Sequence, residues 1–351
     1  MGRDRGEKLL TDFGDLFLPR EAAEPILSDG VRGGLLEWLT EIFAADELKA
    51  IGIAPRKRAI FDGPPGVGKT TLAHHLSARL GLPMLAVRPE RIIDSWVGST
   101  GQNIGKLFDL AAEGFAVDGG GENTEPIVLF LDEFDALGQK RRSGTRQGAE
   151  DERNAFVNTL LQRIEKFDSF LIAATNFGKD IDPAIWRRFD MHIALELPGP
   201  FERERILARY LAPFGLPPRA LELLAEGFNT ASPALMRQFC EQLKRQLIIG
   251  PKLGHDMGKA QVFARLVATV HPHPELGKPP MWATAENDRA RDRAIDAIPW
   301  PLPLAKDLRI ETAASVGGGM AENVVSIAGR PAVVRADALP AAGRPEQEKK
   351  P

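Results

Sequence analysis

Residues 63–70 read Gly63-Pro64-Pro65-Gly66-Val67-Gly68-Lys69-Thr70 and satisfy the pattern G-x-x-x-x-G-K-[ST]. The stretch lies between a short apolar run at 58–61, which favours a strand, and a helical pattern at 69–80. In that context, the backbone N–H groups of a glycine-rich loop can surround a triphosphate at the N-terminus of a helix. The alternative is a glycine turn that binds nothing, and the flanking strand and helix argue against it.

The side chains at the end of this loop are suited to phosphate and metal contacts. Lys69 can neutralise charge on the β and γ phosphates, and the hydroxyl of Thr70 can ligate Mg²⁺. Thr71 follows in the same helical turn and is expected to contact the nucleotide. The sequence therefore predicts a site for a nucleoside triphosphate and Mg²⁺.

A second motif ends a buried strand in two carboxylates. The apolar run at 127–131 is followed directly by Asp132 and Glu133, at the end of a strand where open α/β sheets bind ligands. We expect Asp132 to hold Mg²⁺ through water and Glu133 to polarise the water that attacks the γ-phosphate. A solvated acidic turn is the alternative interpretation.

Apolar runs alternate with helical patterns through the first part of the chain, which predicts an α/β fold with a parallel sheet covered on both faces. The predicted strands are at 58–61, 84–87, 127–131, 170–174 and 191–197. Three helical patterns follow, at 201–214, 232–249 and 259–270. The predicted divisions are an N-terminal extension (1–33), an α/β nucleotide-binding domain (34–198), an all-α lid (199–271) and a Pro/Ala-rich tail, largely disordered (272–351).

The segments GPPGVGKT and LFLDEFDAL resemble the Walker motifs of AAA+ ATPases, particularly the AAA subgroup. The resemblance covers about residues 35–250 and implies a five-stranded αβα P-loop NTPase core with a helical lid. It also implies the cofactors ATP and Mg²⁺ and an ATP hydrolase activity. Asn176 matches the family's sensor 1, a polar side chain that positions the attacking water; a capped helix start is the alternative.

Several arginines match positions that read the γ-phosphate in this family. The segment at 181–190 resembles the one that ends in an arginine finger, which implies that Arg188, or else its neighbour Arg187, acts on the adjoining subunit's nucleotide. The subgroup often separates its two arginines by Pro-Gly, whereas here they are adjacent. Arg237 matches sensor 2, with a surface arginine as the alternative. A finger acting in trans implies a homo-oligomeric ring, most often a hexamer.

Trp96, Val97 and Gly98 resemble the pore loop with which AAA unfoldases grip a polypeptide. A simply packed aromatic is the other interpretation. The leading hypothesis is a ring-forming remodeller that threads a protein substrate through its central pore. An alternative is that the chain is the ATPase subunit of a separately encoded protease. A separately encoded adaptor is another partner to consider.

A DNA-associated ATPase, such as a loader or recombination helper, is the alternative from a different class. Its main support is the charge-dense stretch at 139–153, although no aromatic residues interleave with those charges. A nucleotide-gated scaffold that hardly turns over is a third reading, against which Glu133, Asn176 and Arg188 argue.

Composition sets broad limits on the function. The net charge of −3 gives no general attraction to nucleic acid or a membrane surface. One cysteine excludes an intrachain disulfide and a thiolate zinc cage. The N-terminus lacks the apolar run of a signal peptide, and no stretch reaches the 18 apolar residues of a membrane span, so we expect a cytoplasmic protein without a membrane partner.

Overall fold

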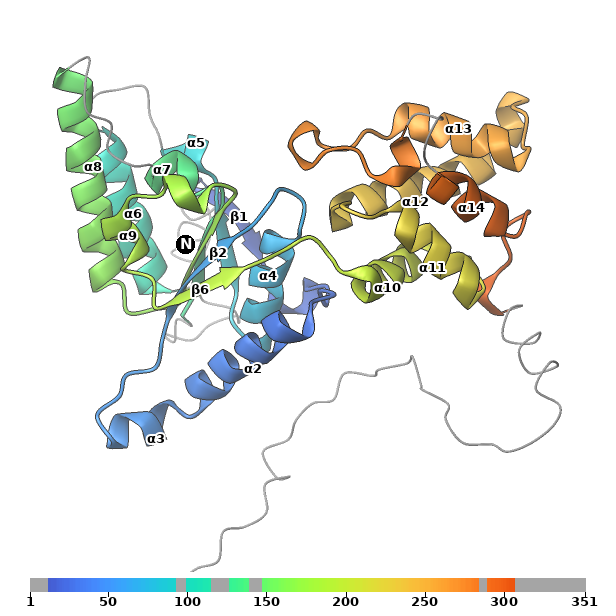
Figure 1. Ribbon diagram of the computed structural model, residues 1–351. Coiled ribbons are helices and arrows are strands. Elements are labelled where there is room, and N and C mark those ends of the chain that lie inside the picture. The colour runs from blue at the N-terminus through green and yellow to red at the C-terminus, as the bar shows by residue number, and fades with distance from the viewer. Residues whose placement is uncertain (1–11, 93–98, 115–125, 139–146, 284–288, 307–351) are drawn as a thin grey trace, which may run out of the picture. The chain divides into compact units, whose positions relative to one another are not determined.

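The computed structural model describes residues 12–92, 99–114, 126–138, 147–283 and 289–306 (Figure 1). Its centre is a six-stranded sheet of order β1-β3-β4-β5-β2-β6. The strands are β1 (Gly14–Phe17), β2 (Arg58–Asp62), β3 (Met84–Val87), β4 (Val128–Leu131), β5 (Leu171–Thr175) and β6 (Met191–Ala194). Neighbours from β3 to β6 pair in parallel, which confirms the predicted five-stranded parallel core.

The sixth strand, β1, comes from the segment predicted as an N-terminal extension. It pairs antiparallel with β3, with Gly14 opposite Val87 and Phe17 opposite Met84. A Cβ at position 14 would lie 2.0 Å from the carbonyl oxygen of Ala86, so only glycine fits at this register. Residues 14–17 of the predicted extension are therefore part of the sheet.

Helices cover both faces of the sheet, as predicted (Figure 1). Successive strand residues point to opposite sides, so that each face presents apolar side chains for the helices to bury. Ile60, Leu85 and Leu129 pack with α6 (Ser99–Glu113) and α8 (Gln147–Lys166). Phe61 and Phe130 pack on the other face, with α2 (Asp29–Phe43) and α4 (Lys69–Arg79). The shorter elements are η1 (Pro19–Glu21), α3 (Ala45–Ala50), α5 (Pro89–Ile92), α7 (Asp135–Gly138), η2 (Gly178–Asp180) and α9 (Pro183–Trp186).

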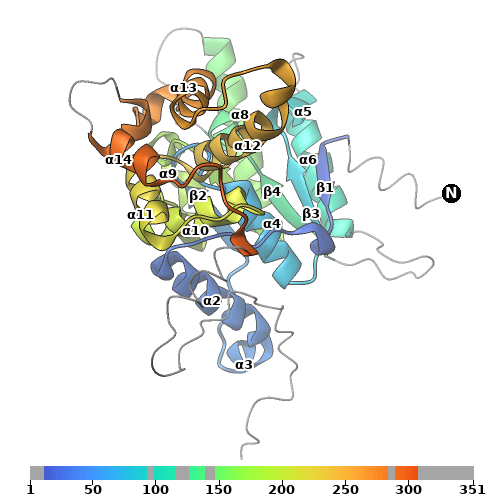
Figure 2. The same cartoon turned by 90° about the vertical axis from the view of Figure 1, so that its right-hand side faces the viewer.

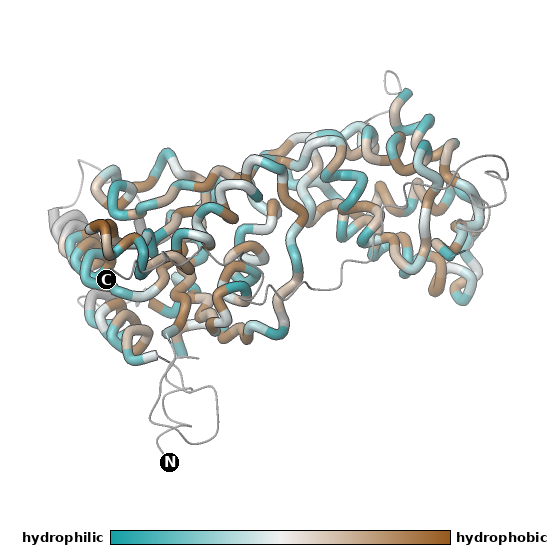
Figure 3. The backbone as a smooth tube through the Cα atoms, turned by 90° about the horizontal axis from the view of Figure 1, so that it is seen from below, coloured by the Kyte–Doolittle hydropathy of each residue, from teal (hydrophilic) through white to brown (hydrophobic). Residues whose placement is uncertain are grey.

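A group of helices follows β6 (Figure 2). These helices form a domain with its own hydrophobic core. Its helices are α10 (Pro200–Leu211), α11 (Pro218–Gly227), α12 (Pro233–Ile249), α13 (Lys259–Thr269) and α14 (Arg289–Ala297), with short turns η3 (Pro251–Leu253), η4 (Pro274–Leu276) and η5 (Pro280–Trp282). Hydrophobic and hydrophilic residues alternate along these helices (Figure 3), as expected for amphipathic elements around one core. The rings of Phe228, Phe239 and Trp282 meet edge to face at its centre.

The helical domain extends beyond the boundary that the sequence predicts at residue 271. Met281, Trp282 and Leu302 are buried in its core, and the indole N–H of Trp282 donates to the carbonyl of Val270 at 2.6 Å. Residues 272–306 were expected to belong to a disordered tail because of their prolines. Two of those prolines, Pro274 and Pro280, instead begin short turns, and the second of these turns buries Met281 and Trp282. Residues 307–351 lie outside the described part of the chain.

Candidate functional site

The glycine loop joins β2 to α4 and is shaped by close backbone contacts. A Cβ at Gly63 would lie 2.2 Å from the carbonyl oxygen of Leu195 on the neighbouring β6 side, so a side chain is excluded there. Gly68, at the N-cap of α4, has φ 101°, a conformation that favours glycine. The first turn of α4 begins beside the loop, and its N–H groups have no carbonyl partner within the helix.

Lys69 is buried in the loop that it follows, with 8% of its surface exposed. Its Nζ donates to the carbonyls of Gly63 at 2.7 Å and Pro64 at 3.0 Å, and to Oδ1 of Asn176 at 2.7 Å. All three ammonium protons therefore have acceptors. Burial lowers the pKa of Lys69, and the nearby carboxylates of three residues, Asp132, Asp62 and Asp135, oppose that shift.

Thr70 and Asp132 form a pair of oxygen donors beside Lys69. The Thr70 hydroxyl donates to Oδ2 of Asp132 at 2.9 Å. Among the described residues, no group of three or more His, Cys, Asp or Glu side chains is placed to hold a metal ion by itself. A metal at this pair would therefore take its remaining ligands from water and phosphate, which is how Mg²⁺ is usually held. The donor set fits that ion.

Glu133 is exposed and sits in a tight turn at the end of β4. Its φ is 46°, in the left-handed region, and its N–H donates to Oδ1 of Asp132 at 2.9 Å. The next residue, Phe134, donates its N–H to the carbonyl of Ala174 at 2.8 Å and buries its ring. The turn fixes the Glu133 backbone at the sheet edge next to the Thr70–Asp132 pair.

Asp135 holds the end of β5, a role that the sequence reasoning missed. Its Oδ1 accepts from the Thr175 hydroxyl at 3.1 Å and from the backbone N–H of Asn176 at 3.3 Å. Asn176 is thereby placed to meet Lys69. The signal lay in the quoted segment LFLDEFDAL, whose last carboxylate comes three residues after Asp132.

A cavity of about 350 Å³ opens where these side chains meet. The α/β domain lines it with Pro65, Gly66, Gly68, Lys69, Thr70, Thr71, Asp132, Glu133 and Asn176, and the lid adds Tyr210, Pro233, Ala234 and Arg237. The N–H of Ala234 donates to the carbonyl of Gly66 at 3.1 Å. Ser232 caps α12, as predicted, by accepting from the N–H of Leu235. Arg237 is exposed and 3.9 Å from Glu241.

A second, largely apolar cavity of about 490 Å³ adjoins the loop at Val67. Ile26, Leu27 and Val31 form one wall, and the β6–α10 connection forms another, including Leu195. Sequence reasoning assigned no site role to these N-terminal residues. The volume and the largely apolar lining of this cavity suit a flat ring attached to a phosphate chain held by the loop.

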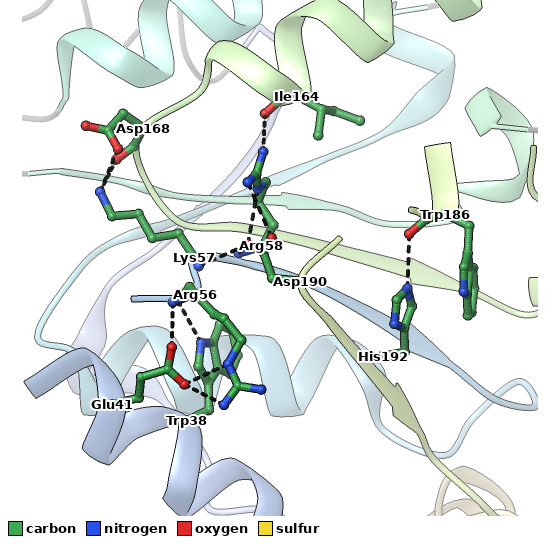
Figure 4. A network of polar contacts seen from close by, with 10 residues as sticks. All are labelled: Trp38, Glu41, Arg56, Lys57, Arg58, Ile164, Asp168, Trp186, Asp190 and His192. Atoms are coloured by element: carbon green, nitrogen blue, oxygen red, sulfur yellow. Dashed lines mark hydrogen bonds and ion pairs between the residues drawn. The ribbon is translucent and has the colours of Figure 1, made fainter. Parts of the chain in front are cut away.

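The two candidate finger arginines lie apart from these cavities, since neither lines them. Arg187 is exposed, whereas Arg188 is half-buried and pairs with Glu165 at 2.8 Å. Asp190 anchors the segment: its Oδ2 accepts from the backbone N–H of Arg58 at 3.3 Å and from Nε of the same residue at 3.2 Å (Figure 4). The segment is thus tied to the start of β2.

Two sets of predicted residues fall outside the described chain. Trp96, Val97 and Gly98 are in the gap at 93–98, and the first part of the charge-dense stretch is in the gap at 139–146. Within the described residues, no helix is both long and apolar enough to cross a membrane.

A family model described as "ATPase family associated with various cellular activities (AAA)" matches residues 59–197. An uncharacterized AAA family ATPase, y4kL, of Sinorhizobium fredii is 35% identical over 223 residues, 61% of this chain and 61% of that protein. The 26S proteasome regulatory subunit 10B homolog A of Arabidopsis thaliana is 30% identical and covers 70% of this chain and 64% of its own. The ATP-dependent zinc metalloprotease FtsH 1 of Symbiobacterium thermophilum is 32% identical over 51% of this chain and 30% of its own.

The crystal structure of the FIGL-1 AAA domain is similar with a TM-score of 0.56 and 20% identity, covering 89% of this chain and 94% of that one. This likeness supports the fold. The chain spans less than two thirds of the length of these curated relatives. The residues that match the AAA ATPase family model, 59–197, include the loop, the two acidic residues after β4 and the end of β5.

Proposed function

We propose that this chain hydrolyses ATP with Mg²⁺ at the cavity beside the glycine loop. The observation that carries the proposal is the convergence of Lys69, Asp132 and Asn176 from the ends of three adjacent parallel strands, β2, β4 and β5. Open α/β sheets bind ligands at this edge. A buried ammonium beside acidic oxygens matches the charge of a metal-bound triphosphate.

Each residue has a role in this scheme. Lys69 binds the β and γ phosphates, and Thr71 lines the same cavity. Thr70 and Asp132 hold Mg²⁺, which when bound neutralises charge on the phosphate oxygens. Glu133 orients and deprotonates the attacking water, and Asn176 positions that water.

The adjoining apolar cavity is assigned to the adenine ring. Its walls of Ile26, Leu27 and Leu195 offer van der Waals contact, and Val67 connects it to the phosphate loop. Arg237 lines the phosphate cavity from the lid and is assigned to the γ-phosphate. ATP would then contact both domains at once.

We further propose that the chain works as a homo-oligomeric ring in which Arg188 or Arg187 serves the neighbouring copy. In support, both arginines lie away from the chain's own cavity, so neither can serve it in cis without rearrangement. Arg187 is the more exposed of the two, and Arg188 would have to leave Glu165.

The proposed substrate is a polypeptide gripped by Trp96. Two relatives are named as an ATP-dependent zinc metalloprotease and a proteasome regulatory subunit, which favours a protein client over DNA. An ATPase partnered with a separate protease is a special case of the same proposal.

The test uses the full chain with Glu133→Gln, which is expected to bind ATP and release phosphate at least about 10²-fold more slowly. Glu113→Gln, an exposed glutamate on α6, is the matched control and should hydrolyse normally. The stalled variant is then incubated with an unfolded, labelled protein and with single-stranded DNA of similar mass, with and without Trp96→Ala. The exposed aromatic Phe201 provides the control Phe201→Ala.

ATP-dependent retention of the unfolded protein that is lost with Trp96→Ala and kept with Phe201→Ala supports threading. If the stalled variant instead retains DNA, equally with and without Trp96→Ala, the DNA-associated alternative would replace the threading proposal. Equal hydrolysis by Glu133→Gln and the parent chain would remove the catalytic assignment itself.

A further inference from the structure

The lid contributes to the nucleotide cavity one polar side chain that has no role in the proposed hydrolysis, Tyr210 on α10. It is the single tyrosine of the chain. Its ring is half-buried and packs against the hydrophobic core of the lid, and the residue also lines the cavity of about 350 Å³ beside the glycine loop. Within the described part of the chain, its hydroxyl makes no hydrogen bond. A phenol can donate one hydrogen bond and accept another, so Tyr210 has a polar group to offer a ligand.

The other lid residues that line this cavity are engaged, apolar or charged. The N–H of Ala234 already donates to the carbonyl of Gly66 at 3.1 Å. Pro233 has no N–H to donate. Arg237 carries a guanidinium, which suits a phosphate oxygen. Among the described lid residues at the cavity, Tyr210 therefore supplies the uncharged hydroxyl that is still available to a ligand.

The proposed scheme gives partners to the triphosphate and to the base of ATP, but none to the sugar. Lys69 and the loop N–H groups take the phosphate oxygens, and Thr70 with Asp132 takes the metal. The base is assigned to the adjoining apolar cavity. The two ribose hydroxyls remain, and each of them is an uncharged donor and acceptor like the phenol.

The two cavities meet at the lid residue Pro233, which lines both of them. A nucleotide with its base in one cavity and its phosphates in the other must pass Pro233 with its ribose, because the ribose joins the base to the phosphates. Tyr210 lines the phosphate cavity from α10, and α10 packs against α12, the helix that begins at Pro233. The phenol is therefore on the lid side of the expected ribose position.

We propose that the hydroxyl of Tyr210 binds a ribose hydroxyl of ATP and so lets the site distinguish ribonucleotides from deoxyribonucleotides. This inference rests on the proposed function, because it adds a contact to the same nucleotide. A hydrogen bond between uncharged groups corresponds to a preference of roughly three- to tenfold for ATP over the analogue that lacks the contacted hydroxyl. The preference falls on KM, because the ribose is held in the same way before and during phosphate transfer.

The first test is calorimetric titration of the Glu133→Gln chain, which is expected to leave nucleotides intact, with ATP, 2′-deoxy-ATP and 3′-deoxy-ATP. We expect ATP to bind roughly three- to tenfold more tightly than one of the two analogues. Adding Tyr210→Phe, which keeps the ring and its packing, should make the affinities for ATP and that analogue equal. Thr269→Val is the matched control: it removes an exposed lid hydroxyl at the end of α13 and should keep the preference.

The second test uses the single tyrosine as a probe. 3-Fluorotyrosine introduced at position 210 gives one ¹⁹F resonance, whose chemical shift reports the surroundings of the phenol. We expect different shifts in the complexes with ATP and with the more weakly bound analogue, because ATP alone offers the hydroxyl partner. A ring that only packs in the lid core would give the same shift in both complexes.

Equal affinities for the three nucleotides in the Glu133→Gln chain, or a preference that survives Tyr210→Phe, would overturn the ribose contact. Identical ¹⁹F shifts in the two complexes would overturn it as well. If Tyr210→Phe weakens the binding of all three nucleotides by the same factor, the phenol contacts a phosphate and the ribose assignment is wrong. Absence of binding of any of the three nucleotides would instead remove the proposed function.

Discussion

The backbone of Glu133 is expected to hold strain that the chain keeps for its proposed catalytic role. Its φ of 46° lies in the left-handed region, which residues with a side chain such as glutamate rarely adopt. Three hydrogen bonds impose this conformation. The N–H of Glu133 donates to Oδ1 of Asp132, and the N–H of Phe134 donates to the carbonyl of Ala174. The N–H of Ala136 donates to the carbonyl of Glu133 at 2.9 Å. Such over-determined conformations are typical of functional sites.

The size of the effect follows from the conformation. A left-handed residue with a Cβ is destabilised by about 1–2 kcal/mol, and asparagine tolerates the region better than glutamate. We therefore expect Glu133→Asn to raise the free energy of unfolding by about 1 kcal/mol and Glu133→Gln to leave it unchanged. Glu133→Gly relieves the same strain but loses about 0.5–1 kcal/mol to the entropy of the unfolded chain, so it should fall between them.

Urea unfolding of the nucleotide-free chains, followed by circular dichroism, measures the ranking. Glu113→Asn on α6 is the control, and its ordinary helical backbone predicts a loss of a few tenths of a kcal/mol instead of a gain. Phosphate release is measured on the same samples, and the three substitutions at position 133 should all abolish it. If Glu133→Asn is no more stable than Glu133→Gln, the turn is not strained. If Glu133→Asn still hydrolyses ATP, the Glu133 carboxylate is not the base.

Three further outcomes are expected. Asn176→Ala should lower kcat by about 10²–10³-fold without raising KM, because the side chain is assigned to the attacking water and competes with phosphate for Lys69; a raised KM at normal kcat would contradict this in steady-state assays. Trp282→Ala should destabilise the lid by about 3–5 kcal/mol in urea unfolding, whereas unchanged stability would place residues 272–306 outside its core. Burial raises the pKa of the Cys240 thiol from 9.0 to about 12, so the stability that the protonated thiol contributes is complete below pH 9 and is lost as the pH rises toward 12. The difference in free energy of unfolding between the parent chain and Cys240→Ala should therefore become smaller across that range. A difference that does not change with pH would contradict this expectation.

The parallel core was predictable because its strands are short, continuous apolar runs separated by helical patterns. The predicted run at 84–87 coincides with β3. The antiparallel β1 was not predictable, since Gly14-Asp15-Leu16-Phe17 shows little of the pattern of a buried strand and gains its stability from pairing with a distant segment. The lid boundary was missed for a similar reason: prolines indicate irregular structure, but burial of Trp282 depends on helices far away in the sequence.

The candidate site divides in the same way between local and distant determinants. Lys69, Asp132 and Asn176 each directly follow a predicted strand or its loop, and parallel strands end at one edge, so their meeting was predictable. The apolar cavity beside Val67 was not, because Ile26 and Leu27 reach it from a segment without periodicity. The pairing of Arg188 with Glu165 joins α8 to the finger segment and also has no local signal.

The hydrogen bonds of Lys69 suggest how phosphate binding and water positioning are linked. The ammonium has three protons and already uses them on Gly63, Pro64 and Asn176. A γ-phosphate that binds Nζ must take over at least one of these bonds. The two carbonyls belong to the loop that also has to hold the phosphates, whereas the Asn176 side chain can turn away at its own χ angles. In the proposed scheme, a phosphate bound to Nζ would therefore free the Asn176 amide that is assigned to orient the attacking water.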